Sequence, residues 1–300
     1  MANQLSKKRW YRLVPIAFIT YSLAYLDRAN FGFAAAGGMA RDLDINAATS
    51  SLLGSLFFLG YFFFQIPGTV YAAKNSARKL IFWCLILWGA LAMATGMTNN
   101  VKGLIVIRFM LGVVESAVMP SMLVFLSNWF TKHERSRANT FLILGNPVTI
   151  LWMSILSGYL VDSLGWRWMF ILEGFPAIIW AFLWWRLVVD KPAQAKWLSK
   201  DEKDNLQAEL DIEQKSIKPV RNYAVAFRSK VVILLCLQYF LWCIGVYGFV
   251  MWLPSIINAS PDSNIVKTGW LASVPYLLAI IGMLVASFFS DKTLRRSIFI

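Results

Sequence analysis

Residues 45–73 read INAATSSLLGSLFFLGYFFFQIPGTVYAA, and this stretch holds no charged side chain. A helix that crosses the hydrocarbon core of a bilayer needs about 20 apolar residues, a length that this stretch exceeds. A helix on the surface of a soluble protein would instead show one apolar and one charged face. Comparable uncharged stretches occupy residues 80–101, 116–131, 138–161, 231–261 and 268–290. The sequence therefore predicts an all-α integral membrane protein.

The composition of the whole chain supports this class. Of its 300 residues, 58% are hydrophobic and 15% are charged, which lies outside the range of ordinary soluble domains. Two further apolar spans carry internal charges. Residues 11–36 include Asp27 and Arg28, and residues 168–187 include Glu173. These charges are expected to lie at membrane depth, where an ionised side chain is costly and often functional.

The stretch 116–131 is too short to cross a bilayer by itself. It reaches a sufficient length when it is extended backwards through Glu115 and Arg108, which places both charges inside the membrane. With this extension, eight spanning helices are predicted.

The positive charge of the chain, a net +13, is unevenly distributed. If the amino terminus is cytoplasmic, the outer loops keep only four of the 29 Lys and Arg residues, namely Arg41, Lys102, Arg167 and Lys267. Cytoplasmic loops of membrane proteins carry such an excess of basic residues. The basic balance thus indicates a multi-pass membrane protein with a cytoplasmic amino terminus, and nucleic acid is not an expected partner. The expected location is the inner (plasma) membrane.

A polar segment divides the predicted spans into six and two. Residues 1–188 are expected to form an amino-terminal six-helix bundle, residues 189–230 a cytoplasmic loop, and residues 231–300 the first two helices of a second bundle with the start of a third. Within the loop, Ser199 precedes early acids and good helix formers, which predicts a short surface helix. Six plus two helices do not complete two bundles, so the chain is expected to be a carboxy-terminally truncated form or fragment of a longer protein.

The charges within the spans have a definite helical arrangement. Arg28 shares one face with Tyr21 and Tyr25, so a guanidinium and two phenols can line one wall that suits a carboxylate. Asp27 points about 100° away and is better placed to meet another helix. Structural ion pairs between helices are the alternative interpretation.

A second set of charges follows one stripe of the fourth predicted span. Arg108, Gly112 and Glu115 are spaced by four and three residues, and Gly112 permits close approach of a neighbouring helix. Burial favours the neutral acid whereas a nearby arginine favours the carboxylate, so Glu115 is expected to bind and release a proton as its surroundings alternate. The predicted proton-coupling residues are Asp27, Glu115 and Arg108.

The 14 Trp residues gather near helix ends. This position predicts that they anchor the helices at the membrane interfaces. The tryptophans concerned include Trp129, Trp166, Trp168, Trp184 and Trp185.

Several motifs resemble the major facilitator superfamily, and within it the anion:cation symporter branch of phthalate permease-like and sugar-acid transporters. The resemblance spans nearly the whole chain. It rests on 25–30 (YLDRAN), 61–68 (YFFFQIPG), 108–117 (RFMLGVVESA), 128–135 (NWFTKHER), 165–170 (GWRWMF) and 190–199 (DKPAQAKWLS). That family has twelve helices in two six-helix bundles, which implies that about four carboxy-terminal helices are absent here.

The resemblance also implies site residues. Tyr25, Arg28, Tyr61 and Asn146 match substrate-contacting positions of sugar-acid symporters, with Asn146 replacing the glutamine of some members. Asp27 and Glu115 match their protonatable acids. One departure follows the second predicted span, where Ala73 and Ser76 replace the usual acid and glycine; in the corresponding loop of the second bundle, Asp291 keeps the acid.

The expected function is secondary active transport of a small organic anion, coupled to protons or another cation, by alternating access. A membrane enzyme would need a convergent constellation of catalytic or metal-binding residues, and the single His and three Cys follow no such spacing. No catalytic residue, cofactor or metal is therefore predicted. A remnant or fragment that transports nothing remains the alternative. Proteins of this superfamily usually work as monomers within the lipid bilayer. The predicted arginine and phenols indicate a carboxylate substrate but do not separate a sugar acid from an aromatic carboxylate.

Overall fold

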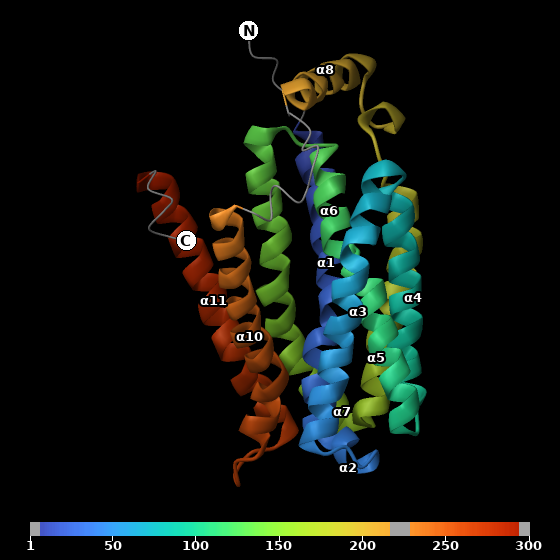
Figure 1. Ribbon diagram of the computed structural model, residues 1–300, viewed down its shortest axis with the longest axis vertical. Helices are drawn as coiled ribbons and strands as arrows, with labels where there is room; N and C mark the ends of the chain where they lie inside the picture. The colour runs from blue at the N-terminus through green and yellow to red at the C-terminus, as the bar shows by residue number, and fades with distance from the viewer. Residues whose placement is uncertain (1–6, 217–228, 294–300) are drawn as a thin grey trace.

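The structure is a computed structural model that describes residues 7–216 and 229–293, without the side chains of residues 27, 29, 214–216 and 287–293. The regular secondary structure of this part of the chain is entirely helical, so the predicted all-α class is confirmed (Figure 1). The elements are α1 (Lys8–Ala34), the π-helical η1 (Ala35–Met39), α2 (Ala40–Asp42), α3 (Ala47–Lys74), α4 (Ala77–Met97), α5 (Val101–Ser116), α6 (Val118–Ser127), α7 (Lys132–Leu187), the 3-10 helix η2 (Pro192–Gln194), α8 (Lys200–Ser216), α10 (Lys230–Asn258) and α11 (Ile265–Thr293).

Within the described residues, 6 helical segments are long and apolar enough to cross a membrane. One of them, Val101–Ser127, joins α5 and α6 and holds both Arg108 and Glu115, as the sequence predicted. Another is α7, in which Gly165 has φ +82° and divides the 56-residue segment into two arms. Glycine adopts this backbone conformation without the strain that a side chain would add. The helix α1, which contains Asp27 and Arg28, is not among the six segments.

Four of the described helices, α3, α4, α5 and α8, begin at polar side chains that cap free backbone N–H groups. The predicted surface helix is present as α8. Its Glu202 N–H donates to Ser199 Oγ at 3.2 Å, and the Ser199 N–H donates to Glu202 Oε2 at 2.8 Å. The spanning helices α3, α4 and α5 are capped in the same way by Asn46, Ser76 and Asn100.

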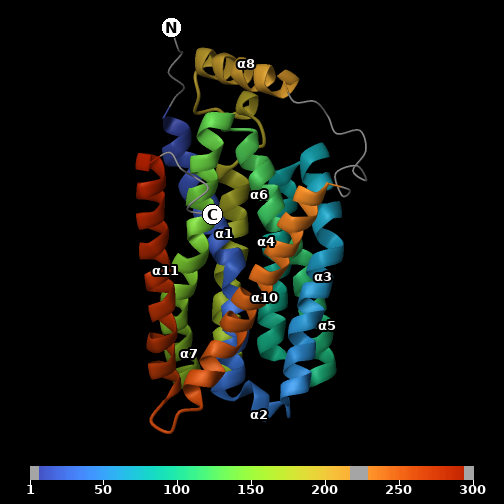
Figure 2. The same cartoon turned by 60° about the vertical axis from the view of Figure 1, so that its left-hand side comes forward.

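The helices α10 and α11 meet at the end opposite α8 and diverge towards the α8 end (Figure 2). Near their meeting point, glycines bring backbones together. A Cβ on Gly32 of α1 would lie 2.8 Å from the Met251 carbonyl oxygen of α10, and one on Gly269 of α11 would lie 2.5 Å from the Ser154 carbonyl oxygen of α7. These contacts leave no room for a side chain, so α10 packs closely on α1 and α11 packs closely on α7 at this end.

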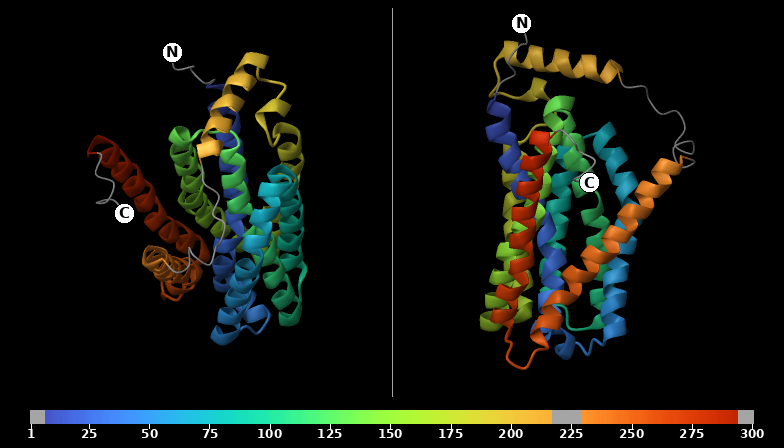
Figure 3. Two further views of the ribbon diagram at one scale, coloured as in Figure 1. Left: turned by 45° about the horizontal axis from the view of Figure 1, so that its top comes forward. Right: turned by 90° about the vertical axis from the view of Figure 1, so that its left-hand side faces the viewer.

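The segment from η2 to α8 lies across the opposite end of the helices (Figure 3). Trp197 stacks on Trp129 with ring centroids 5.4 Å apart. Arg135 Nη2 lies 2.9 Å from Glu213 Oε1, and Lys8 Nζ lies 3.2 Å from Glu202 Oε1. Aromatic stacking and ion pairs therefore attach this segment to α1 and to the start of α7.

The tryptophans correct one sequence-based prediction. Trp129, Trp166 and Trp184 are buried in protein and so cannot face lipid as anchors, whereas Trp168 and Trp185 are exposed. The three buried indoles each donate a hydrogen bond, for example from Trp184 Nε1 to the Arg78 carbonyl oxygen at 3.0 Å. An indole N–H that finds a protein acceptor can be buried at little cost, and sequence position near a helix end does not reveal this.

Ser76, one of the two departures from the family pattern, has a defined role in the structure. Its hydroxyl caps α4 and also lies 2.6 Å from Asp190 Oδ2, while Asp190 Oδ1 accepts the Arg78 backbone N–H at 2.9 Å. The acid next to the turn between α3 and α4 is therefore Asp190, from the segment after α7, and not a residue of the turn itself. Asp291, named as the acid of the second copy, has no described side chain.

Candidate functional site

Arg28 of α1 lies inside a group of aromatic rings. Its guanidinium carbon is 4.7 Å from the centroid of Tyr25 and 5.0 Å from that of Tyr61. Phe57 and Tyr247 follow at 5.8 Å each. Aromatic faces attract a cation, more strongly where water is excluded, and the Arg28 side chain is only 10% exposed. Tyr25 belongs to the same face of α1, whereas α3 contributes Tyr61 and Phe57 and α10 contributes Tyr247.

Two polar partners fix the orientation of the guanidinium. Arg28 Nε donates to Glu115 Oε2 at 3.2 Å, and Arg28 Nη1 donates to the Tyr247 hydroxyl at 3.0 Å. The Glu115 side chain is 1% exposed. A buried carboxylate is costly unless a cation and hydrogen bonds compensate for lost water. Arg28 and Glu115 thus depend on each other, and the planar guanidinium holds further donors for a second acceptor.

Glycines bring α3 and α5 into direct backbone contact beside this pair. A Cβ on Gly112 would lie 1.9 Å from the Phe57 carbonyl oxygen, and one on Gly60 would lie 2.5 Å from the Phe109 carbonyl oxygen. The close approach that the stripe of α5 predicted is therefore confirmed. This contact places the face of α5 that holds Glu115 against α1 and α3.

Arg108 occupies the same stripe two turns earlier. It is buried, with its guanidinium carbon 4.3 Å from the ring centroid of Phe31 and 5.2 Å from that of Phe57. Arg28 from α1 donates to Glu115, whereas the sequence interpretation expected a nearby arginine without identifying which one. Seven residues of helix separate Arg108 from Glu115 by roughly 10 Å along the axis.

A cavity of about 690 Å³ opens between α3 and α10 next to Arg28. Tyr61 and Tyr247, which both contact the guanidinium, line it, together with Tyr239 and Gln65. Its volume lies within the range of small-molecule sites. Phenols, one amide and a nearby guanidinium give it a mostly apolar wall with a few hydrogen-bonding groups.

The structure does not assemble every predicted site residue. Asp27 lies in α1, and its side chain is outside the described residues. Tyr21 is buried and its ring lies 6.0 Å from that of Tyr25. Asn146 is half-buried in the first arm of α7, and the hydrogen bonds described here do not connect it to Arg28. Tyr25, Arg28, Tyr61 and Glu115 do come together, and their roles stay predictions.

Sequence reasoning missed Phe57 in this group and did not connect Tyr247 to Arg28. Phe57 precedes Tyr61 by one helical turn, and this spacing was the available signal for it. Tyr247 lies 219 residues from Arg28, and no spacing rule connects them.

A second polar cluster joins α1 to both arms of α7. Asn30 Nδ2 donates to Glu173 Oε2, Ser157 Oγ donates to Glu173 Oε1 at 3.1 Å, and Ser157 Oγ lies 3.3 Å from Asn30 Oδ1. All three side chains are buried. The sequence had identified Glu173 as a charge at membrane depth but not its partners.

This arrangement can bind an anion through the Arg28 guanidinium and the nearby phenols. Glu115, beside them, is an acid that can bind a proton. In the searched part of residues 7–216 and 229–293, no group of three His, Cys, Asp or Glu side chains is arranged to hold a metal ion.

Comparison with known families gives a match over almost the whole chain. Residues 17–300 match the family model described as Major Facilitator Superfamily. A quinolone resistance transporter of Acinetobacter baumannii is 33% identical over 293 residues, which cover 94% of this chain and 67% of that protein. A putative tartrate transporter of Agrobacterium vitis is 31% identical over 304 residues, covering 99% of this chain and 70% of its own length.

Among solved structures, the chain is similar to a bacterial homolog of the human lysosomal transporter Spinster in an inward-facing and unoccupied conformation. The TM-score is 0.76 at 18% sequence identity, over 97% of this chain and 64% of that one. This likeness concerns the fold alone. The chain therefore spans between 64% and 70% of the lengths of these three proteins.

Proposed function

This chain belongs to the Major Facilitator Superfamily, a family of membrane transporters and not of enzymes, and on that premise we propose that it acts in proton-coupled transport of a small organic anion by alternating access. The observation that carries the proposal is Arg28, buried among four aromatic rings, paired to Glu115 at 3.2 Å and adjacent to a cavity of about 690 Å³. A cation so enclosed suits a carboxylate that enters from the cavity.

The proposed topology has eight passes with the amino terminus in the cytoplasm of a cell with an inner membrane. The 6 apolar segments give seven passes, because Gly165 interrupts α7 and its two arms count separately. The helix α1 is added as a further pass, which makes eight. The excess of Lys and Arg in loops on the α8 side supports this orientation. Residues 1–188 would form the first bundle, 189–230 the connecting loop and 231–300 part of a second bundle.

In the proposed mechanism, the substrate carboxylate and Glu115 compete for Arg28. When Glu115 takes up a proton it becomes neutral and no longer needs the guanidinium. Arg28 can then bind the substrate carboxylate. One proton and one negative charge enter together, so the buried cluster keeps the same net charge in both states, which avoids the cost of an unpaired ion at membrane depth.

The other predicted residues take supporting roles in this proposal. Tyr25 and Tyr61 would offer their ring faces and hydroxyls to the substrate, with Asn146 as a further hydrogen-bonding group from α7. Asp27 would be a second protonation site, and Arg108 would keep the carboxylate form of the acids accessible.

The substrate class proposed is a small hydroxylated or aromatic carboxylate. Similarity to a putative tartrate transporter supports a hydroxy acid. Similarity to a quinolone resistance transporter favours a second candidate function, outward transport of an aromatic acid. The phenols of the cavity are compatible with either, since they can donate to hydroxyls or stack on rings.

The test is transport in sealed membrane vesicles that contain the chain, with labelled tartrate, galactonate, phthalate and a quinolone under an imposed proton gradient. We expect uptake of one acid that an uncoupler stops, and at least about 30-fold less uptake with Arg28→Gln. Arg186→Gln removes the same charge from an exposed position and should leave uptake unchanged. Proton-driven uptake that survives Arg28→Gln would overturn the proposal. Absence of all transport by an inserted, folded chain would favour the alternative of a non-transporting fragment.

A further inference from the structure

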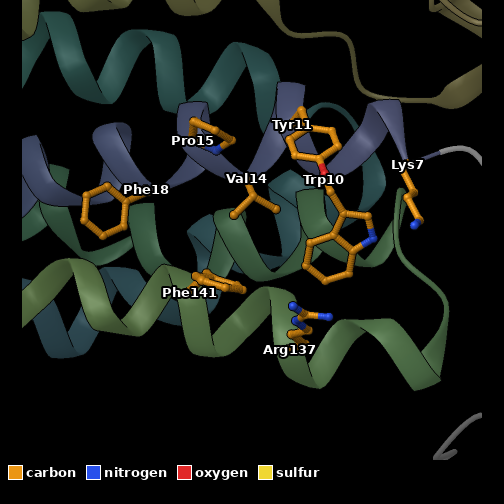
Figure 4. Close-up of a pocket in the computed structure, with 8 residues that line it drawn as sticks. All are labelled: Lys7, Trp10, Tyr11, Val14, Pro15, Phe18, Arg137 and Phe141. Carbon is orange, nitrogen blue, oxygen red and sulfur yellow. The ribbon is translucent and has the colours of Figure 1, made fainter. Parts of the chain in front are cut away.

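A groove of about 550 Å³ runs between α1 and the first arm of α7 at the end where α8 lies (Figure 4). It lies apart from the cavity beside Arg28, because Phe18, at its deeper end, precedes Arg28 by ten residues, which is roughly 15 Å of helix. The proposed transport mechanism makes no use of this groove.

The polarity of the groove changes along its length. Lys7 and Arg137 lie at one end, with Trp10 between them, and Phe18 and Phe141 lie further along (Figure 4). The lining therefore passes from two cations through an indole to an apolar slot. Since α1 spans the membrane in the proposed topology, this gradient runs from the water interface towards the hydrocarbon core. A charged head followed by an apolar chain has the matching shape.

The charge at the open end favours an anion. The lining residues include two basic side chains and no carboxylate. Arg137 is exposed and lies 5.5 Å from the ring centroid of Trp10 and 5.9 Å from that of Phe141, so rings orient its guanidinium. The acid beside Trp10, Glu134, is held by Arg9 through contacts of 2.8 and 3.0 Å and its charge is balanced there.

We propose that this groove binds an anionic phospholipid of the cytoplasmic leaflet, with the phosphate at the end that holds Lys7, Trp10 and Arg137 and one acyl chain along Val14, Phe18 and Phe141. Basic pockets between spanning helices on the cytoplasmic side bind such headgroups. A free anion in water would be served by the two cations alone and would leave the apolar slot without a ligand. The leaflet assignment rests on the proposed orientation of the chain, whereas the binding itself does not require transport.

The test uses the purified chain in detergent and native mass spectrometry with dioleoyl phosphatidylglycerol and dioleoyl phosphatidylcholine. We expect retention of phosphatidylglycerol in preference to phosphatidylcholine. Lys7→Gln combined with Arg137→Gln should weaken phosphatidylglycerol binding by roughly 5-fold for each cation and about 25-fold for the pair. The matched control, Lys79→Gln with Arg186→Gln, removes the same charge from exposed positions at the same end and should change binding less than about 2-fold.

Two additional measurements distinguish a lipid headgroup from free inorganic phosphate as the bound anion. Val14→Phe narrows the slot without changing charge and should weaken lipid binding while leaving the thermal stability in phosphatidylcholine unchanged. Millimolar inorganic phosphate should not displace the lipid. Displacement by inorganic phosphate, equal retention of the two lipids, or unchanged binding by the Lys7 and Arg137 double variant would each overturn the proposal.

Discussion

Two carboxylates lie buried among the spanning helices, and their surroundings differ in kind. Glu115 accepts a hydrogen bond from the Arg28 guanidinium, whose aromatic neighbours Tyr61 and Tyr247 line a cavity of about 690 Å³. Glu173 accepts hydrogen bonds from Asn30 and Ser157, and none of these three residues lines that cavity. Both acids are nearly inaccessible, at 2% and 5% exposure.

The difference indicates that burial alone does not identify a coupling residue. The described contacts of Glu173 include an amide and a hydroxyl from packed helices, and neither group lines the cavity beside Arg28. The cation beside Glu115 can exchange partners, because a ligand in the adjacent cavity can compete for it. We therefore expect Glu115 to take part in transport and Glu173 to support the packing of α1 against α7.

The largest expected effect separates the two acids directly. In the wild type, one coupled proton and a pH difference of two units support up to about 100-fold accumulation of substrate. The glutamine in Glu115→Gln cannot take up a proton, so this variant should show almost no proton-driven accumulation. Exchange of labelled for unlabelled substrate, which needs no net proton movement, should persist. Accumulation and exchange are measured in the same vesicles.

The matched variant is Glu173→Gln. It should retain accumulation within about 2-fold and lower the free energy of unfolding by roughly 1 kcal/mol, since an amide replaces a carboxyl group that accepts from Asn30 and Ser157. Loss of coupling in Glu173→Gln together with normal coupling in Glu115→Gln would reverse the comparison.

The second prediction concerns the geometry of the exchangeable cation. Arg28→Lys keeps the positive charge but replaces the planar fork by a point charge, which cannot serve Glu115 and Tyr247 in the same way. Substrate affinity should fall roughly 10-fold.

The control for Arg28→Lys is Arg9→Lys at a second arginine–glutamate pair, near α8, in which Arg9 is buried and Glu134 is partly exposed. Thermal stability should fall there while the substrate concentration at half-maximal uptake stays unchanged. An unaltered half-maximal concentration in Arg28→Lys would mean that a simple charge is sufficient.

The third prediction tests the contribution of α10. Tyr247→Phe removes the hydroxyl that accepts from Arg28 at 3.0 Å while keeping the ring that lines the cavity. One such hydrogen bond corresponds to about 1 kcal/mol, so affinity should fall about 5-fold. Tyr276→Phe, a change at a tyrosine of α11 whose ring packs on Phe249, is the control and should have no effect on affinity. Equal affinities for the wild type and Tyr247→Phe would remove α10 from the site.

The smallest effect is expected at an acid outside the membrane. Asp42 accepts a hydrogen bond from Trp166 Nε1 at 2.9 Å, and this bond, together with the nearby Arg167, lowers the pKa of its carboxyl. A lowered pKa in the folded state stabilises the protein above the pKa of the unfolded chain, and this contribution is lost as the pH falls through the folded value. Asp42→Asn should therefore melt at a slightly lower temperature than wild type at pH 7 and at the same temperature in strong acid.

That variant also sharpens the comparison of buried acids. Asp42 is substantially exposed, so its titration should change stability and leave the pH dependence of transport unaltered. If the pH profile of uptake moves in Asp42→Asn, protonation at the outer end contributes to coupling, and the assignment to Glu115 would be incomplete.

Part of the site was predictable from local pattern. The spacing of Arg108, Gly112 and Glu115 predicted one buried stripe, and the structure confirms it with the α3 backbone against Gly112. The same reasoning did not identify the partner of Glu115, because helical periodicity gives the face of a residue within its own helix but not the rotation of the next helix. The partner came from α1, 87 residues away.

The tryptophans show the same limit. Their positions near helix ends suggested membrane anchors, yet Trp129 is buried because the segment after α7 returns and places Trp197 on its ring. Packing of segments distant in sequence decided between lipid and protein as the neighbour of each indole.

The sequence by itself determined the membrane class, the positions of most spanning helices, the capped surface helix after Ser199 and the presence of costly charges within the spans, since these properties depend on hydrophobic length and local hydrogen bonding. Only the tertiary structure decided which charges meet, that Tyr247 reaches Arg28, that Glu173 is enclosed by Asn30 and Ser157, and that two cations end an apolar groove between α1 and α7. The physical reason is that the relative rotation of packed helices depends on close contacts such as Gly112 against Phe57, which involve residues far apart in the chain.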